Sequence, residues 1–240
     1  QAVEATRRLR AAGIGNLSID LMFGFPGQTL EEWRADLRSA LALLPEHLSA
    51  YSLMYEEGTP LYAMLQRGEI EENDEELSRA MYDMLCDVLQ EAGYEHYEIS
   101  NFALPGYRSR HNSGYWDGTP YLGIGAAAHS YDGRSRQWNV SDVKAYIESI
   151  GRGEVPFERE VLDDSMRYND LIVTTLRTRE GIDLRQLGET LGARYVQYLT
   201  ESTRIDIALG LLCVEGDRMR LTRKGLYVSD AVMEDAIYSD

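Results

Sequence analysis

The fold is decided by the stretch LSIDLMFGFPGQTLEE at residues 17–32. In its first seven residues the apolar Ile19, Leu21 and Phe23 recur at every second position, the pattern of a β-strand with one apolar face. The segment GFPGQ that follows contains two glycines and a proline and predicts a loop. Thr29 and Glu32 then form a capping-box pattern, which predicts the start of a helix. Together these signals predict a strand, a loop and a helix, which is one unit of a β/α fold.

The same order of elements recurs further along the chain. Residues 48–55 predict a second strand, and a helical pattern of apolar residues follows it and ends at Gly93. Residues 94–102 predict a third strand. Because strands and helices alternate without long polar linkers, we expect an α/β fold with a parallel sheet and with helices outside it.

The pattern changes at about residue 157. Helical spacing is found at residues 166–176, 183–191 and 195–209, and the turn Glu215-Gly216-Asp217 separates two short strands, which predicts a hairpin. A last helix is predicted at 224–237. Three helices and a hairpin predict a small winged-helix-like α+β domain. We therefore expect two domains, at residues 1–150 and 157–240, with a short linker near 151–156.

Asp20 is the first candidate binding residue. In the predicted strand it shares a face with Ser18 and Met22, whereas Ile19, Leu21 and Phe23 share the apolar face. Burial of an ionised carboxylate on the inner face of a sheet costs several kcal/mol unless the carboxylate has partners. Ligand sites in such folds lie at the carboxyl ends of strands. The position of Asp20 therefore favours a role in ligand binding.

A second candidate site lies in a segment rich in polar and aromatic residues, between the predicted sheet and the winged helix. It contains His111, Asn112, Tyr115 and Trp116. An imidazole beside flat aromatic rings suits a planar macrocycle such as heme, which takes an axial histidine. A histidine in such a loop also serves as a hydrogen-bonded packing residue. The residues alone leave both interpretations open.

Composition limits the classes of function. With 40 acidic and 24 basic side chains the net charge is −16, which argues against nucleic acid as a partner because phosphate contacts need a basic face. Two cysteines are too few for an iron–sulfur cluster motif. The sequence contains no long apolar segment and no secretory signal, so we expect a cytoplasmic protein. Because the chain opens on Gln1 in helical sequence, we also expect a piece of a longer protein.

Several separate stretches resemble one family. The segment at 19–29 resembles a motif of radical S-adenosylmethionine proteins related to oxygen-independent coproporphyrinogen III oxidase. Three further stretches resemble the HemW branch of that family, the heme chaperones, and the last one resembles its HemN-type C-terminal domain. They are YEISNFA at 97–103, HNSGYW at 111–116, YLGIGAAAHS at 121–130 and LTRKG at 221–225.

This resemblance implies the second half of a partial TIM-like barrel, followed by the winged-helix-like domain. It also implies that the full-length protein uses S-adenosylmethionine and a [4Fe-4S] cluster whose cysteines would lie before Gln1. Asp20 corresponds to the residue that binds the ribose of S-adenosylmethionine. His111, Asn112, Tyr115 and Trp116 correspond to the proposed heme contacts.

The function that the resemblance implies is a heme chaperone, which binds heme as cargo and delivers it to an apo-hemoprotein. The alternative is an enzyme, a coproporphyrinogen III oxidase whose substrate is the porphyrinogen. In either case the piece alone is expected to be inactive, and the recipient protein stays open. A half barrel leaves a strand edge unpaired at residues 17–23, so we also expect self-association through that edge.

Overall fold

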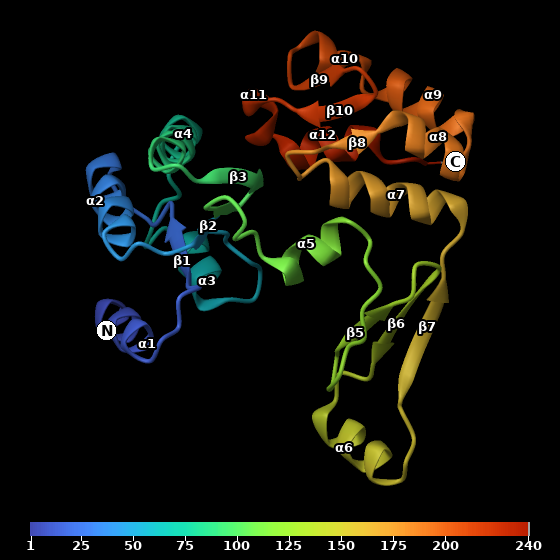
Figure 1. The fold of residues 1–240 in the computed structure, drawn as a ribbon, viewed down its shortest axis with the longest axis horizontal. Coiled ribbons are helices and arrows are strands. Elements are labelled where there is room, and N and C mark those ends of the chain that lie inside the picture. Colours follow the sequence, from blue (N-terminus) through green and yellow to red (C-terminus); the bar gives the residue numbers. More distant parts are fainter. Residues whose placement is uncertain (240) are drawn as a thin grey trace. The chain divides into compact units, whose positions relative to one another are not determined.

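The structure is a computed structural model that describes residues 1–239. The chain forms two compact units, the first from Gln1 to Ser109 and the second from Arg110 onward (Figure 1). Each unit has a hydrophobic core of its own. The predicted domain division between residues 150 and 157 stays a prediction.

The first unit contains four helices and four strands among its described residues. Their bounds are α1 Ala2–Ala11, β1 Ser18–Phe23, α2 Leu30–Leu41, β2 His47–Ser52, α3 Pro60–Gln66, α4 Glu75–Glu91, β3 Glu95–Glu98 and β4 Asn101–Ala103. The predicted strand, loop and helix at residues 17–32 are confirmed as β1, its loop and α2. The capping box is also confirmed, because the Thr29 hydroxyl accepts from the backbone N–H of Glu32 and the Glu32 carboxylate accepts from that of Thr29.

The sheet of the first unit is mixed, with the strand order β1-β2-β4-β3. β1 and β2 are parallel, as expected. β4 is antiparallel both to β2 and to β3, so the expectation of a fully parallel sheet was wrong. The segment 94–102 does not form one strand, because the Glu98 carboxylate accepts from the backbone N–H of Ser100 and from the amide of Asn101 and closes a tight turn there. The described strands do not close a barrel.

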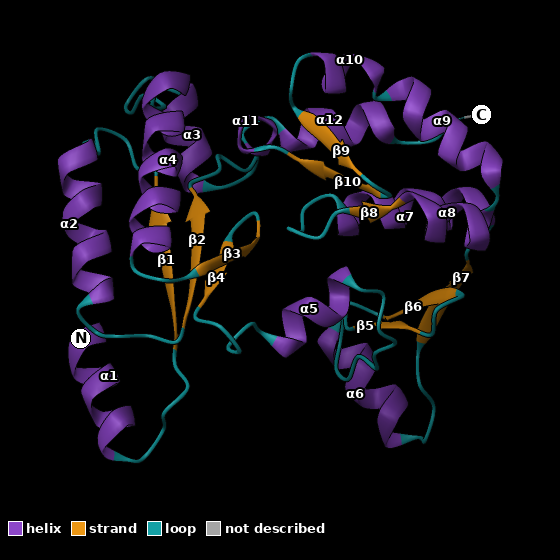
Figure 2. Cartoon of the chain, turned by 45° about the horizontal axis from the view of Figure 1, so that its top comes forward, coloured by secondary structure: helices purple, strands orange, loops and turns teal. Residues whose placement is uncertain are grey.

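One face of this sheet is covered by helices α2 and α4 (Figure 2). Phe23 of β1 stacks on Trp33 of α2, with ring centroids 5.1 Å apart, and the Trp33 indole donates to the carbonyl of Met81 in α4 at 3.0 Å. Trp33 and Met81 are fully buried. The alternation of side chains in β1 thus places Phe23 in the core and leaves Asp20 on the opposite face.

The second unit contains the remaining elements of the described chain. Their bounds are α5 Arg110–Trp116, β5 His129–Tyr131, β6 Ser135–Asn139, α6 Val143–Gly151, β7 Phe157–Val161, α7 Asp164–Thr175, β8 Ile182–Asp183, α8 Leu184–Leu191, α9 Ala193–Ser202, α10 Arg204–Ala208, β9 Leu212–Glu215, β10 Arg218–Leu221, α11 Arg223–Leu226 and α12 Ser229–Ala236.

The C-terminal part of this unit follows the predicted order of elements, with differences at its ends. The hairpin around Glu215-Gly216-Asp217 is confirmed, with β9 and β10 antiparallel, and β8 adds a third strand beside β10. The helix predicted at 195–209 is divided into α9 and α10, and the one at 224–237 into α11 and α12. The helices and strands share one core around Tyr168, Tyr195 and Met219, all fully buried.

A three-stranded antiparallel sheet, β5-β6-β7, was not predicted. Its strands occupy the sequence between residues 129 and 161, and α6 connects β6 to β7. Gly123 is needed beside this sheet, because a Cβ at that position would lie 2.1 Å from the carbonyl oxygen of His129. Tyr121 also pairs with Tyr131 as an isolated antiparallel bridge. Gly123 thus belongs to a backbone segment that runs against β5.

Candidate functional site

The first candidate site is the face of the β1–β2 sheet that α2 and α4 leave uncovered. In the parallel register Ser18 lies opposite His47, Asp20 opposite Ser49 and Met22 opposite Tyr51. Side chains on this face are mostly polar, whereas the other face supplies the core. Asp20, Met22 and Tyr51 are exposed. This arrangement is a polar strip that ends in an exposed methionine and an exposed tyrosine.

His47 forms the buried centre of this strip. Its Nδ1 lies 2.8 Å from the hydroxyl of Ser18, and its Nε2 lies 2.7 Å from the hydroxyl of Tyr97. The Tyr97 hydroxyl also accepts from the backbone N–H of Ser109 at 3.3 Å. Burial lowers the pKa of His47 below its ordinary value of 6.5, and the negative charge of Asp20 partly opposes that shift. At neutral pH the imidazole is therefore uncharged and held at both nitrogens.

A second hydrogen-bonded group lies next to it. The Ser49 hydroxyl donates to the side-chain oxygen of Asn101 at 3.1 Å, and the Asn101 amide donates to Glu98. All three side chains are buried. The sequence analysis missed His47, Tyr97, Ser49 and Asn101 as members of one face. Apart from Met22, every second residue of segments 18–22 and 47–51 is polar or amphipathic, and this spacing is the signal that would have grouped His47 and Ser49 with Asp20.

Asp20 lies on this strip with a free carboxylate. It is exposed, so the cost of burial that the sequence analysis assigned to it does not arise in this chain. Among residues 1–239 no hydrogen bond or ion pair of its carboxylate is found, although its charge acts on His47. A carboxylate with free lone pairs accepts two O–H bonds from a vicinal diol. Asp20 is therefore able to accept hydrogen bonds from a ligand that carries a diol.

The cysteines do not fit an iron–sulfur cluster held by this chain. Cys86 is buried in α4, and Cys213 lies in β9 of the other unit. Among the described residues, no group of three His, Cys, Asp or Glu side chains is placed to hold a metal ion.

The second candidate site is α5, a short helix where the sequence analysis expected a loop. The helix ends at Trp116. In the turn that follows, the Asp117 carboxylate accepts from the backbone N–H and the hydroxyl of Thr119, and Gly118 takes a positive φ of 72°. Because residues four apart share a helical face, His111 pairs with Tyr115 and Asn112 pairs with Trp116. The four motif residues therefore lie on two different faces.

His111 and Tyr115 form the exposed pair. Their rings meet edge to face with centroids 5.0 Å apart, and the Tyr115 hydroxyl lies 3.2 Å from Nε2 of His111. The ring centroids of Tyr115 and Tyr121 lie 4.9 Å apart, and those of Tyr121 and Tyr131 lie 6.2 Å apart. The result is a row of four aromatic rings with a histidine at one end.

Trp116 lies on the inner face of α5, which contacts α7. The guanidinium of Arg177 stacks over its indole at 4.3 Å from the ring centroid. The indole Nε1 is buried and finds no hydrogen-bond acceptor among the described residues. Trp116 thus anchors α5 to the rest of the unit, and Asn112 lies on the same side by spacing. The structure brings together His111 and Tyr115 as an exposed pair and does not bring Trp116 to that surface.

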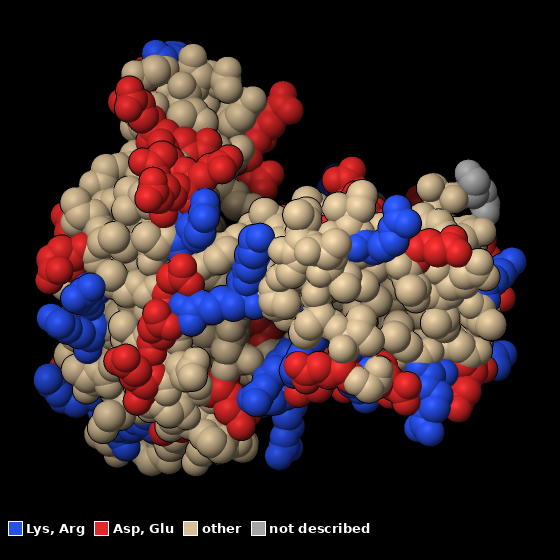
Figure 3. Space-filling view, turned by 90° about the horizontal axis from the view of Figure 1, so that it is seen from above, with Lys and Arg blue, Asp and Glu red and all other residues tan. Residues whose placement is uncertain are grey.

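On the face drawn in Figure 3, Lys and Arg side chains lie beside Asp and Glu side chains and form no continuous basic area. In the described part of the chain, no helix combines the length and the apolar character needed to cross a bilayer.

Comparisons with known proteins place the chain in a class. The HemN C-terminal domain family matches residues 162–228. The solved structure of Escherichia coli coproporphyrinogen III oxidase, HemN, described as a radical SAM enzyme, has a similar fold. Its TM-score is 0.74 at 19% identity, over 98% of this chain and 58% of that one. The fold of this chain therefore matches much of the C-terminal part of the HemN structure.

Three relatives are similar to nearly the whole of this chain. The heme chaperone HemW of Lactococcus lactis is 32% identical over 100% of this chain and 63% of its own length. The heme chaperone HemW of Bacillus subtilis is 36% identical over 94% and 60%. The mitochondrial radical S-adenosyl methionine domain-containing protein 1 of Mus musculus is 43% identical over 97% and 56%.

The chain belongs to the HemW- and HemN-like family of radical S-adenosylmethionine proteins, which confirms the resemblance found in its sequence. It spans less than two thirds of the length of these relatives.

Proposed function

We propose that this chain is part of a heme chaperone, which binds heme and delivers it to an apo-hemoprotein. The observation that carries the proposal is the exposed His111–Tyr115 pair on α5, continued by the rings of Tyr121 and Tyr131. An exposed imidazole is an axial ligand for heme iron, and aromatic rings stack on a porphyrin. The naming of relatives as heme chaperones supports the same proposal.

In this proposal His111 binds the iron through Nε2. In the free protein that nitrogen lies 3.2 Å from the Tyr115 hydroxyl, and both side chains are exposed. The net gain from one exposed neutral hydrogen bond is about 1 kcal/mol, which an iron–imidazole bond readily exceeds. Tyr115 thus orients the imidazole through a hydrogen bond that heme iron can displace. An exposed ligand also suits a protein that must release its cargo.

The test is a titration of the protein with hemin, followed by its Soret absorption. His111→Ala is expected to shift the Soret maximum and to weaken binding at least tenfold, because the axial ligand is lost. His129→Ala removes another exposed histidine of the same unit and serves as the matched control. An unchanged titration of the His111 variant would exclude His111 from the site.

For Asp20 we propose that its carboxylate accepts hydrogen bonds from the ribose of S-adenosylmethionine. That cofactor supplies radical chemistry in the enzymes of this family, and this chain would contribute to its binding. Asp20→Asn is expected to weaken S-adenosylmethionine binding to the full-length protein by calorimetry. Asp36→Asn, on the exposed face of α2, is the control. Equal affinities of the Asp20 variant and the wild type would return Asp20 to a structural role.

The oxidase alternative is tested by turnover. If the full-length protein with its cluster converts coproporphyrinogen III anaerobically with S-adenosylmethionine, the protein is an enzyme and the chaperone proposal fails. A cytoplasmic location also remains our proposal, since the named relatives include both bacterial and mitochondrial proteins.

Self-association is proposed at β1, which is the edge of its sheet among the described strands. An unpaired edge can pair with a second copy. Light scattering that gives a monomeric mass would exclude this pairing.

A further inference from the structure

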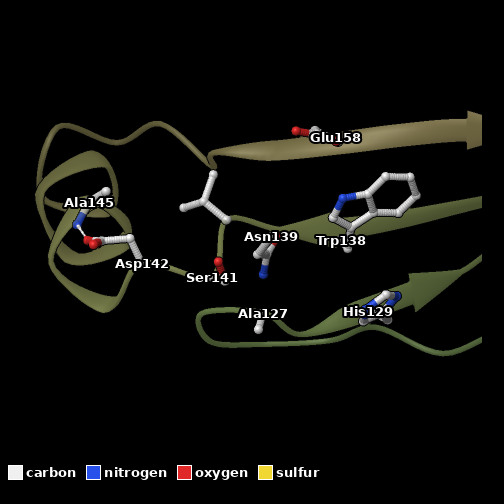
Figure 4. A pocket seen from close by; sticks show the side chains of 9 residues that line it. Ala127, His129, Trp138, Asn139, Ser141, Asp142, Ala145 and Glu158 are labelled. Atoms are coloured by element: carbon white, nitrogen blue, oxygen red, sulfur yellow. Dashed lines mark hydrogen bonds between the residues drawn. The ribbon is translucent and has the colours of Figure 1, made fainter. Parts of the chain in front are cut away.

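A pocket on the β5–β6–β7 sheet is separate from both candidate sites. It has a volume of about 470 Å³ and is lined by nine residues of β5, β6, β7, their connections and the start of α6. Figure 4 shows Trp138 on the middle strand, between Glu158 on β7 and His129 on β5. This order follows from the antiparallel register, in which His129 pairs with Trp138 and Trp138 with Glu158. The three side chains form one row across the sheet.

The chemistry of this row is specific. The indole of Trp138 is half-buried, and the His129 ring lies 6.1 Å away at an angle of 31°. Glu158 is exposed, and among residues 1–239 its carboxylate has neither a hydrogen bond nor an ion pair. Asp142 adds a second carboxylate at the rim, where it caps α6 by accepting from the backbone N–H of Ala145 at 2.7 Å. Neither Lys nor Arg is among the nine described residues that line the pocket.

The basic side chains nearest in sequence have partners of their own, and Lys144 of α6 lies 4.0 Å from the carboxylate of Glu148. Arg159 bonds to Asp132 at 2.9 Å and to Ser135, on the other face of the sheet by alternation. Arg136 bonds to Asp170 of α7 at 2.7 Å. The pocket therefore presents an aromatic face and two carboxylates without a cation of its own.

We propose that this pocket binds the guanidinium of an arginine side chain from a partner protein. A planar guanidinium stacks on an indole and at the same time donates two parallel hydrogen bonds to a carboxylate. Trp138 would supply the stacking face and Glu158 the carboxylate, with Asp142 adding negative potential. A peptide-bound arginine fits better than the free amino acid, because the carboxylates of Glu158 and Asp142 would repel the negatively charged α-carboxylate of free arginine. The proposal is independent of heme binding.

The test uses a capped Gly-Arg-Gly peptide and follows the indole N–H resonance of Trp138 by NMR. A cation–π contact of 0.5–1 kcal/mol corresponds to about a two- to fivefold change in affinity. We therefore expect Trp138→Leu to weaken binding about fivefold, as measured by the backbone amide shifts of β6. We expect Glu158→Gln to weaken it at least about threefold. Glu160→Gln is the matched control, since Glu160 lies on the same strand but does not line the pocket.

A capped peptide with citrulline in place of arginine keeps the shape and removes the charge, so it is expected to bind at least fivefold more weakly. Equal binding of the citrulline peptide, or an unchanged affinity of the Trp138 and Glu158 variants, would overturn the proposal. Tighter binding of free arginine than of the capped peptide would overturn the assignment to a protein partner. If millimolar peptide does not shift the indole N–H resonance of Trp138, the pocket is not an arginine site and the proposal is overturned.

Discussion

Replacing Trp116 by alanine separates the structural from the heme-binding role of the motif on α5. Full burial of a tryptophan that is truncated to alanine costs about 3–5 kcal/mol, so the half-buried indole contributes about 2 kcal/mol. Loss of the Arg177 stack at 4.3 Å adds about 1 kcal/mol. The variant also removes a buried indole N–H that has no acceptor, which offsets about 1 kcal/mol of this loss of stability. We therefore expect Trp116→Ala to lower the free energy of unfolding by about 2 kcal/mol.

The assay is urea unfolding followed by circular dichroism, with a hemin titration of the same samples under native conditions. Trp116→Phe is the matched control. It keeps a ring beneath Arg177 and removes the unsatisfied N–H, so its stability is expected within about 1 kcal/mol of the wild type. Hemin affinity should be unchanged in the phenylalanine variant. If that variant is stable but no longer binds hemin, Trp116 contacts the heme and its assignment as an anchor is refuted.

Two further predictions concern the sheets. Because the pKa of His47 is lowered in the folded state, an unfolded chain takes up a proton first as the pH falls below 6.5. The stability from His47 is thus complete above pH 6.5 and is lost as the pH falls toward the lower folded pKa. His47→Gln should flatten this part of the pH profile in chemical unfolding, and an identical slope would contradict it. Gly123→Ala should cost about 2–3 kcal/mol, because its Cβ would lie 2.1 Å from the His129 carbonyl oxygen. Gly151→Ala in α6 has open space and should be neutral or slightly stabilising, so equal thermal midpoints of the two alanine variants would refute the steric argument.

Local pattern predicted the elements whose signals are close in sequence. Alternation placed Asp20 and Phe23 on opposite faces of β1, and the pair Thr29 and Glu32 placed the start of α2. The burial of Asp20 was predicted wrongly, because alternation gives the face of a residue but not what covers that face.

Elements that depend on distant partners were not predicted. The sequences SRQWN and FEREV of β6 and β7 are too polar to stand out as strands, and they become strands by pairing with each other. The turn within residues 94–102 depends on Glu98 bonding to Ser100 and Asn101, a contact that β-propensity does not register. The sequence identified all four residues of the α5 motif, but only a helical period separates His111 and Tyr115 from Asn112 and Trp116.

The close approach of Gly123 to β5 has a consequence for evolution of the pocket. Trp138, His129 and Glu158 face the same side only in the observed register, and a slip by one residue would turn each strand's side chains to the opposite face. The backbone at Gly123 bonds to the Ser130 hydroxyl at 3.0 Å and, with the bridge between Tyr121 and Tyr131, fixes β5 in place. Gly123 does not line the pocket, but a methyl group at this position would displace the backbone of β5 at His129. The residue at position 123 can thus decide whether the pocket forms.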